Sequence, residues 1–276
     1  MDTDEIMHTA LDLAGMSSIP ADSAVHVKGK DIQRVLMCID AEQSTIMLAK
    51  QLGYDAVIAH HPIGRAYIDF YKVLDRHIEF MLNAGIPRDV AEDAVRELRE
   101  RVMLRAHTSI YTHVTSFAER IGMPLLNIHL PCDELMRREL LRSITGRVER
   151  VRDIGSSVEQ LDEFRRADTR VEVVHGDEDA VVRRYMLVVA AGTNGGYSVA
   201  KAYFEHGYDT VIYLHISPED LARAKSSNLN GNIVILGHLA GDSLGMNMLA
   251  DALRGKGLQV DKMGIIDRDG DRGGAG

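Results

Sequence analysis

The sequence has few of the residues that mark several common protein classes. It contains no tryptophan, five phenylalanines and nine tyrosines, so little aromatic surface is available to stack on nucleic-acid bases. Its formal net charge of −9 disfavours attraction to phosphate backbones and anionic membranes. No apolar run approaches the roughly 20 residues that span a bilayer, and the acidic start lacks the features of a secretory signal. We therefore expect a cytoplasmic protein with neither nucleic-acid nor membrane partners.

Cysteines and common nucleotide-binding motifs are also sparse. Cys38 lies in an apolar run and is interpreted as a small core residue, and Cys132 is too distant to form a zinc-ribbon pair with it. The sequence has no Gly-Lys-Ser/Thr and no full Gly-x-Gly-x-x-Gly, which excludes Walker and Rossmann assignments. Ser198 does not lie in a nucleophile elbow, and we find no plausible Ser-His-Asp or Cys-His set. The segment Gly192–Gly196, between an expected strand and an expected helix, resembles an anion-binding turn. It suggests a phosphate cradle for a small-molecule substrate.

A repeat organises the chain. The pattern Gly-Tyr-Asp-x-Val-Ile occurs at residues 53–58 and again at 207–212. A strand and a helix precede each copy, at 34–39 and 40–52 in the first and at 185–190 and up to about 206 in the second. Further strands are expected at 232–236 and about 258–263, with a helix at about 244–253 between them. The alternation predicts an α/β protein with mostly parallel sheets. The duplicated unit suggests two similar lobes whose strand ends face a cleft, and the residues described below make this a metal-holding cleft in our interpretation.

These patterns suggest domain boundaries. We place the first lobe at 1–130, a polar connecting region at 131–180 and the second lobe at 181–266. Residues 267–276 are expected to be a disordered tail because they cannot bury apolar surface. Residues 77–105 have a helical period that Pro87 interrupts.

Two neighbouring histidines give the strongest functional signal. His60 and His61 follow the apolar run 56–59 and precede Pro62, so they fall at the carboxyl end of an expected strand, where open α/β sheets bind ligands. Adjacent imidazoles are costly to bury without partners and suit divalent metals. The sequence therefore predicts a metal site here.

A second cluster follows the expected strand at 232–236. His238 and Asp242 are four residues apart, so on a helix their side chains would point the same way. Helix capping is the alternative explanation. We interpret this cluster and the histidine pair as halves of one metal site, because a metal needs ligands from several elements.

Other residues could contribute to the same chemistry. His107 and His113 could each supply a ligand, although a locally bonded, half-buried histidine explains each equally well. His215 lies at the repeat position equivalent to His60 and could transfer protons or support a ligand. Asp40 could orient a ligand imidazole or cap a helix. His129 and Asp133 share the four-residue spacing but rank last, because Pro131 argues against a helix between them.

Taken together, these motifs resemble the Nif-three-like dinuclear metal-centre family, whose members are often labelled GTP cyclohydrolase I type 2 homologues. The similarity runs from about Arg34 to about Met263 and covers the His-His-Pro, Ala-His-Thr and late Gly-His-x-x-x-acid motifs. It implies two α/β lobes around two metals and assembly into toroidal hexamers. It also implies metal ligands at His60, His61 and His238, with Asp242 at a position that is usually Glu.

The larger departure from this family lies at Tyr111. The family usually has a metal-binding Asp where this chain has Tyr111, so His107, His113 or the Tyr111 phenol would have to complete the second position. The resemblance implies one or two divalent transition-metal ions (Zn, Fe, Mn or Ni) per chain. We expect a metal-dependent hydrolase-like homo-oligomer that acts on a nucleotide or phosphorylated small molecule, and the resemblance names GTP ring opening as one such activity. His107 and His215 are the expected catalytic proton-transfer groups. The alternative is a non-catalytic metal-binding regulatory or scaffold oligomer.

Overall fold

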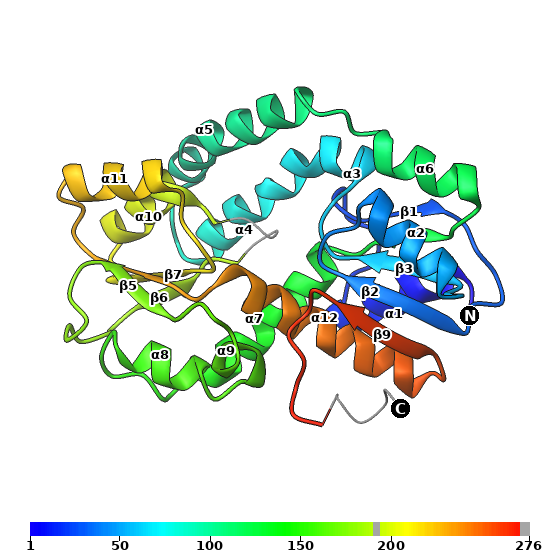
Figure 1. The fold of residues 1–276 in the computed structure, drawn as a ribbon. Coiled ribbons are helices and arrows are strands. Elements are labelled where there is room, and N and C mark those ends of the chain that lie inside the picture. Colours follow the sequence, from blue (N-terminus) through cyan, green and yellow to red (C-terminus); the bar gives the residue numbers. More distant parts are fainter. Residues whose placement is uncertain (190–193, 271–276) are drawn as a thin grey trace. The chain divides into compact units, whose positions relative to one another are not determined.

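The computed structural model describes residues 1–189 and 194–270, and the chain divides into two compact units (Figure 1). The first unit comprises 1–73, 101–135 and 242–265, and the second comprises 74–100, 136–241 and the described residues from 266 onward. This division differs from the lobes at 1–130 and 181–266 that the sequence suggests. Residues 242–265 join the first unit because the last strand pairs with its sheet, and residues 74–100 join the second.

The first unit is built on a five-stranded sheet. Its strands are β1 (Ala24–Val27), β2 (Arg34–Cys38), β3 (Ala56–Ala59), β4 (Leu125–Asn127) and β9 (Gln259–Met263). Their order is β1-β4-β3-β2-β9, and every neighbouring pair is parallel except β1 with β4. In Figure 1, β9 (red) lies beside β2 (blue), although more than 200 residues separate them in the sequence.

Alternating side chains bury both faces of this sheet. Val35 and Met37 of β2 pack in a cluster with helices α1 (Thr3–Ala14) and α12 (His238–Gly255). Leu36 and Cys38 point the other way, into a cluster with α2 (Gln43–Gln51) and α6 (His113–Ile121). A parallel sheet covered on both faces explains the nearly continuous apolar strands. Both cysteines are buried and free, as expected for Cys38.

The second unit has a four-stranded sheet. Its strands are β5 (Glu172–His175), β6 (Tyr185–Leu187), β7 (Thr210–Tyr213) and β8 (Asn232–Ile235), in the order β5-β8-β7-β6. The pairs β6–β7 and β7–β8 are parallel, and β5 is antiparallel to β8. β1 to β4 follow the same chain order and pairing, so the repeat extends over four strands. The predicted α/β class with mostly parallel sheets is confirmed, but β5 falls within the region expected to be only a connection.

The sequence repeat has the same structural role in both units. Gly53 adopts a left-handed conformation (φ +75°) in the turn before β3, and one carboxylate oxygen of Asp55 accepts hydrogen bonds from the backbone N–H groups of Gln33 and Arg34. The Arg34 guanidinium lies 4.1 Å from the centre of the Tyr54 ring. The motif thus joins the start of β2 to the turn before β3.

The second copy repeats these contacts before β7. Gly207 has φ +82°, and Asp209 accepts from the N–H groups of Arg183 and Arg184. The Arg184 guanidinium lies 4.3 Å from the Tyr208 ring centre. The six-residue match is therefore a structural repeat.

The remaining helices follow the sequence signals with one notable exception. Pro87 separates α4 (Asp75–Asn83) from α5 (Arg88–His107), as its position predicts. Pro131, however, lies in the first turn of α7 (Leu130–Ile144), where the absence of its N–H costs no helical bond. The others are α3 (Gly64–Asp69), a 3₁₀ helix (Phe70–Leu74), α8 (Asp153–Val158), α9 (Asp162–Arg165), α10 (Gly196–Glu205) and α11 (Pro218–Ser226). Among the described residues, no helix has the length and apolar character to cross a membrane.

Candidate metal centre

The carboxyl ends of three neighbouring parallel strands of the first unit carry polar side chains. Asp40 follows β2, His60 and His61 follow β3, and His129 follows β4. Parallel strands end at the same edge of a sheet, so these groups gather there. The ring centres of His60 and His129 are 4.7 Å apart, and those of His60 and His61 are 5.3 Å apart.

The antiparallel strand β1 adds a buried carboxylate to the same edge. Because β1 pairs with β4 so that Ala24 faces Asn127, the residues before β1 lie beside those after β4. Asp22 is fully buried, and its Oδ2 accepts a hydrogen bond of 2.7 Å from Nδ1 of His129. The backbone N–H of His129 donates to Ser23 Oγ at 2.9 Å. The position of His129 is therefore fixed through both its backbone and its ring.

All three histidines are bonded in the same way. Nδ1 of His60 lies 3.2 Å from the Ile128 carbonyl oxygen, and Nδ1 of His61 lies 2.7 Å from Asp40 Oδ1. Carbonyl and carboxylate oxygens accept only, so each Nδ1, like that of His129, acts as the donor. In a neutral imidazole Nε2 is then unprotonated and carries a lone pair. This is the orientation that proteins commonly give to metal-binding histidines.

Two buried carboxylates from helices complete the cluster. Asp133 of α7 and Asp242 of α12 are 1% and 2% exposed. His60 Nε2 lies 3.4 Å from Asp133 Oδ1 and 3.6 Å from Asp242 Oδ1, and His61 Nε2 lies 3.2 Å from Asp242 Oδ2. His60, Asp133 and Asp242 each have one potential metal-ligand atom within 4.8 Å of those of the other two. The same holds for one ring nitrogen from each of His60, His61 and His129. Both groups could hold a metal ion.

The carboxylates dominate the electrostatics of the two histidines after β3. Burial alone would lower the pKa of His60, but the nearby carboxylates of Asp242 and Asp133 raise it well above its usual value. Burial likewise opposes the charged form of His61, and its bonds to Asp242 and Asp40 outweigh this and raise its pKa to about 9. The cluster therefore attracts positive charge, whether a proton or a metal ion.

Unpaired buried atoms indicate that a metal ion fits this cluster. His60 Nε2 and both carboxylate oxygens of Asp133 are buried and make no hydrogen bond. Buried polar atoms are nearly always paired, and each exception needs an explanation. Imidazole and carboxylate are both ordinary ligands of divalent metals, and a bound ion would satisfy all three atoms at once.

Several predicted residues lie elsewhere in the first unit. His107 and His113 are exposed, at the end of α5 and the start of α6. Tyr111 is 47% exposed. Among the described residues, the groups with metal-binding spacing include neither histidine. Roles for His107 as a ligand or proton-transfer group stay predictions.

The other predicted residues belong to the second unit. His238 begins α12, one turn before Asp242, and its ring centre lies 4.5 Å from that of the exposed His215. Their proposed roles, ligand for His238 and proton transfer for His215, stay predictions. The pairing of these two rings was not foreseen.

The described part of the glycine-rich turn, residues 194–196, does not form a phosphate cradle. Gly192 and Thr193 lie outside the described residues. At the start of α10, Asp220 Oδ1 accepts a hydrogen bond of 3.2 Å from the N–H of Tyr197, and a Cβ on Gly196 would lie only 2.8 Å from Asp220 Oδ2. A carboxylate of the protein itself therefore occupies the helix N-terminus at which the sequence suggested phosphate.

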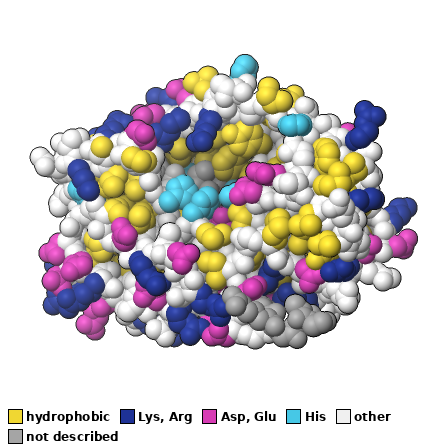
Figure 2. All heavy atoms as spheres, in the orientation of Figure 1, with side chains coloured by type: hydrophobic (Ala, Val, Ile, Leu, Met, Phe, Trp, Pro, Cys, Tyr) yellow, Lys and Arg dark blue, Asp and Glu magenta, His cyan; other side chains and the backbone are white. Residues whose placement is uncertain are grey.

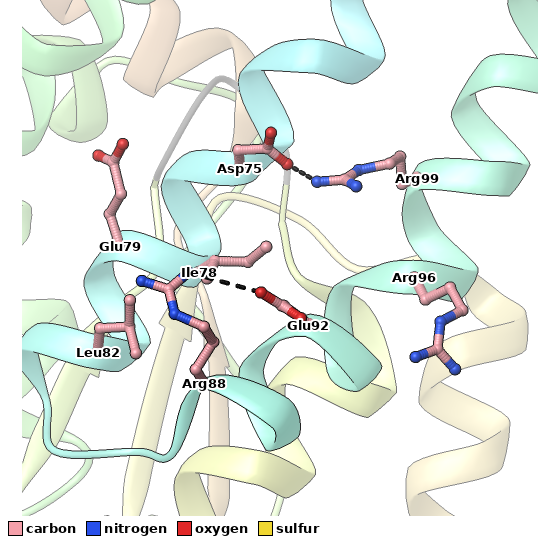
Figure 3. Close-up of a pocket in the computed structure, with 8 residues that line it drawn as sticks. All are labelled: Asp75, Ile78, Glu79, Leu82, Arg88, Glu92, Arg96 and Arg99. Atoms are coloured by element: carbon pink, nitrogen blue, oxygen red, sulfur yellow. Dashed lines mark hydrogen bonds and ion pairs between the residues drawn. The ribbon is translucent and has the colours of Figure 1, made fainter.

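The second unit also contains a pocket of about 540 Å³ between α4 and α5 (Figure 3). Its three arginines pair with carboxylates, Arg99 with Asp75, Arg88 with Glu92 and Arg96 with Asp93. Pairing reduces their attraction for an anionic ligand. Acidic and basic side chains are also intermingled over the face drawn in Figure 2. The histidine–carboxylate cluster of the first unit is thus the better functional candidate.

Sequence reasoning ranked two residues of the cluster too low. His129 and Asp133 were discounted because of Pro131, yet Pro131 lies in the first helical turn and the N–H of Asp133 donates to the carbonyl of His129. The available signal was the four-residue spacing together with the tolerance of helix starts for proline. Asp22 carried no comparable signal, because its role depends on the pairing of β1 with β4.

The fold and the cluster define an α/β protein with a histidine–carboxylate centre at the carboxyl ends of parallel strands. A family model described as Duf34/NIF3 (NGG1p interacting factor 3) matches residues 24–267, and the chain belongs to this family. The crystal structure of a NIF3 superfamily protein from Sphaerobacter thermophilus is 42% identical, with a TM-score of 0.92 over 96% of this chain and 98% of that one. The resemblance noted in the sequence is confirmed.

More distant structures share the fold. Reduced HcgD from Methanocaldococcus jannaschii is 14% identical, with a TM-score of 0.56 over 95% of this chain and 97% of that one. A Bacillus cereus protein related to NIF3 is 12% identical, with a TM-score of 0.52 over 95% and 96%. A comparison with curated proteins finds no match.

Proposed function

We propose that this chain is a metal-dependent hydrolase-like protein that acts on a nucleotide or another phosphorylated small molecule. The observation that carries the proposal is the set of three imidazoles whose Nδ1 atoms are all bonded to oxygen, gathered around two buried carboxylates. His60, His61 and Asp242 would hold one or two ions of Zn, Fe, Mn or Ni, with His238 as a further ligand implied by the family resemblance. A ring-opening reaction on GTP is the named candidate, suggested by that resemblance.

The chain's own residues have distinct roles in this proposal. A bound divalent ion would act as a Lewis acid and make water a nucleophile near neutral pH. Asp40 holds the His61 ring by its Nδ1–H, and the Ile128 carbonyl holds that of His60. These contacts fix the tautomers and place Nε2 of each ring beside a buried carboxylate. His107 and His215 are the proposed proton-transfer groups.

Metal analysis followed by turnover assays tests the proposal. We expect close to one or two equivalents of a transition metal per chain in the natively purified protein, and hydrolysis of one member of a nucleotide and phosphate-ester panel. His61→Ala should abolish both metal retention and turnover, whereas His8→Ala, an exposed histidine on α1, should change neither. Wild-type turnover after joint replacement of His60, His61 and His238 would contradict the metalloenzyme proposal.

A non-catalytic metal-binding oligomer is the second candidate. It is favoured by exposed apolar side chains around the end of α5, where Leu104 is 62% and Ile110 is 82% exposed, together with Met103 and Tyr111. Exposed apolar side chains that lie close together often mark interaction surfaces. Light scattering of the wild type and of a Leu104→Glu, Ile110→Glu double variant tests this. We propose a homo-oligomer, with a hexamer implied by the family resemblance, and expect smaller species for the variant.

A further inference from the structure

Phe70, the first residue of the 3₁₀ helix, lies beside the histidine cluster of the first unit. Its ring centre is 5.3 Å from that of His129, and the two rings are nearly perpendicular, at 79°. We propose that Phe70 is a specificity-determining residue that stacks against the planar ring of a nucleobase. The inference rests on the proposed function and narrows its substrate from phosphorylated small molecules in general to nucleotides.

The exposure of Phe70 provides the first argument. Neither of the two apolar clusters that cover the five-stranded sheet includes Phe70, and the residue is only half-buried. Its ring has no polar atom, so its contact with water and polar neighbours brings no conventional hydrogen bond in return. Small-molecule sites are typically lined by apolar and aromatic side chains together with a few well-placed polar groups. A half-exposed ring beside three imidazoles matches that composition.

The anchoring of the segment that carries Phe70 provides the second argument. Asp69, the preceding residue, forms ion pairs with Arg65 (Nε to Oδ2, 3.1 Å) and Lys72 (Nζ to Oδ1, 2.7 Å). Val73, three residues after Phe70, is buried. Contacts on both sides therefore hold the backbone at Phe70. A ring that is already held in place loses little conformational freedom when a ligand stacks on it, which favours binding.

The position of the ring relative to the cluster provides the third argument. Stacked aromatic rings have centres about 4.5–7 Å apart, so a nucleobase on Phe70 would lie about as near to it as His129 does. The ring centre of His129 is in turn 4.7 Å from that of His60 and 6.0 Å from that of His61. The side chain of His61 is 27% exposed, so solvent reaches this part of the cluster. A stacked base would therefore bring its substituents close to the groups proposed to hold the metal.

Tryptophan fluorescence of the full-length protein tests the proposal. The chain contains no tryptophan, so Phe70→Trp introduces a single indole whose emission reports its own surroundings. Titration with GMP, AMP, CMP and UMP should quench this emission for at least one nucleotide, because the base stacks on the indole. Ribose 5-phosphate, which lacks the base, should leave the emission unchanged.

Phe117→Trp is the matched control. Phe117 packs against an apolar cluster of the same unit, so the emission of this variant should respond to none of the compounds. No response of Phe70→Trp to any of the nucleotides, or equal responses of the two variants, would overturn the proposal.

Affinity measurements separate stacking from a structural role of the ring. Equilibrium dialysis gives the ratio of the affinities for the nucleotide that binds best and for ribose 5-phosphate. Phe70→Ala should lower this ratio about 5- to 150-fold, which is the usual effect of removing one base-stacking side chain. Phe70→Tyr keeps the ring and should retain the wild-type ratio. If Phe70 only covers His129, Phe70→Ala weakens both compounds alike, and the unchanged ratio would overturn the proposal.

Failure of this proposal and failure of the proposed function give different results. Base-dependent binding that is lost in Phe70→Ala, in a protein that neither retains metal nor turns over any substrate, would reject the hydrolase-like function and support the stacking role. Turnover of phosphate esters without an aromatic ring, at a rate that Phe70→Ala leaves unchanged and with no preference for nucleotides, would reject the stacking role and leave the metal-dependent activity in place.

Discussion

The contact between helices α7 and α12 in the first unit predicts that Gly245→Ala destabilises the protein. Gly245 is buried on α12, and a Cβ there would lie 2.3 Å from the Cys132 carbonyl oxygen and 2.9 Å from its carbon. Close C–H···O contacts are about 3.3 Å or longer, so the two helices would have to separate locally by about 1 Å. The obstacle is backbone, which cannot rotate away as a side chain can.

The expected magnitude follows from two opposing effects. Forcing extra atoms into a packed core typically costs about 1–3 kcal/mol, and a backbone clash favours the upper end. Alanine in place of glycine in a helix interior returns about 1 kcal/mol. The net loss for Gly245→Ala should therefore be about 2 kcal/mol. For a chain of this size that corresponds to a fall in Tm of about 4–8 °C.

The same helix offers a matched control. Gly255 ends α12, is exposed, and has nothing within 4 Å of its added Cβ. Gly255→Ala should be neutral or stabilising by up to about 1 kcal/mol. Urea denaturation of both variants would measure the difference directly. Since Cys132 precedes Asp133 on α7, Gly245→Ala should also weaken Zn²⁺ binding, whereas Gly255→Ala should not. Equal stability of the two variants would refute the close packing of α7 on α12.

Further predictions concern a buried histidine, the partner of His61 and the two aspartates of the repeat. Burial, with a smaller effect of Arg76, lowers the pKa of His77 to about 4, so between about pH 6.5 and pH 4 the unfolded chain binds a proton that the folded chain excludes. The free energy of unfolding should therefore decrease by up to about 3 kcal/mol as the pH falls from about 6.5 to about 4. Denaturant titrations at several pH values should show a weaker pH dependence for His77→Gln. Equal acid sensitivity of both proteins would contradict it. Asp40→Asn should reduce Zn²⁺ affinity by about 10–100-fold because Asp40 orients His61, while the stability of the metal-free protein should change by less than about 0.5 kcal/mol. Asp55→Asn and Asp209→Asn should each cost about 1–2 kcal/mol, because each carboxylate accepts two backbone hydrogen bonds; very unequal losses would argue against equivalent roles.

Much of the local structure could be predicted from the sequence. The strand before His60 was recognisable because a short apolar run lies between Gly53 and Pro62, and β3 covers Ala56–Ala59. The duplicated Gly-Tyr-Asp motif was likewise visible, because the same six-residue pattern occurs twice in the sequence. Local signals of this kind also located the histidines at the end of a strand.

Long-range pairing could not be predicted in the same way. Nothing in the residues of β9 indicates that it pairs with β2 of the first unit, so Asp242 and β9 were assigned to the second lobe. Asp220 reaches the start of α10 from a different helix, so the occupied helix N-terminus was equally hidden. In both cases the deciding contact joins segments that are distant in the sequence.

The position of β9 has a consequence for synthesis on the ribosome. The first unit receives Asp242, most of α12 and β9 only after the strands of the second unit have been translated. Until β9 emerges, β2 is an edge strand with unpaired backbone groups and an incompletely covered apolar face, which is a state prone to association with other chains. This edge of the sheet therefore stays unpaired while about 130 further residues are added between β4 and β9, at about 5–20 residues per second. Assembly of the candidate metal centre is consequently expected among the last events in the maturation of the protein.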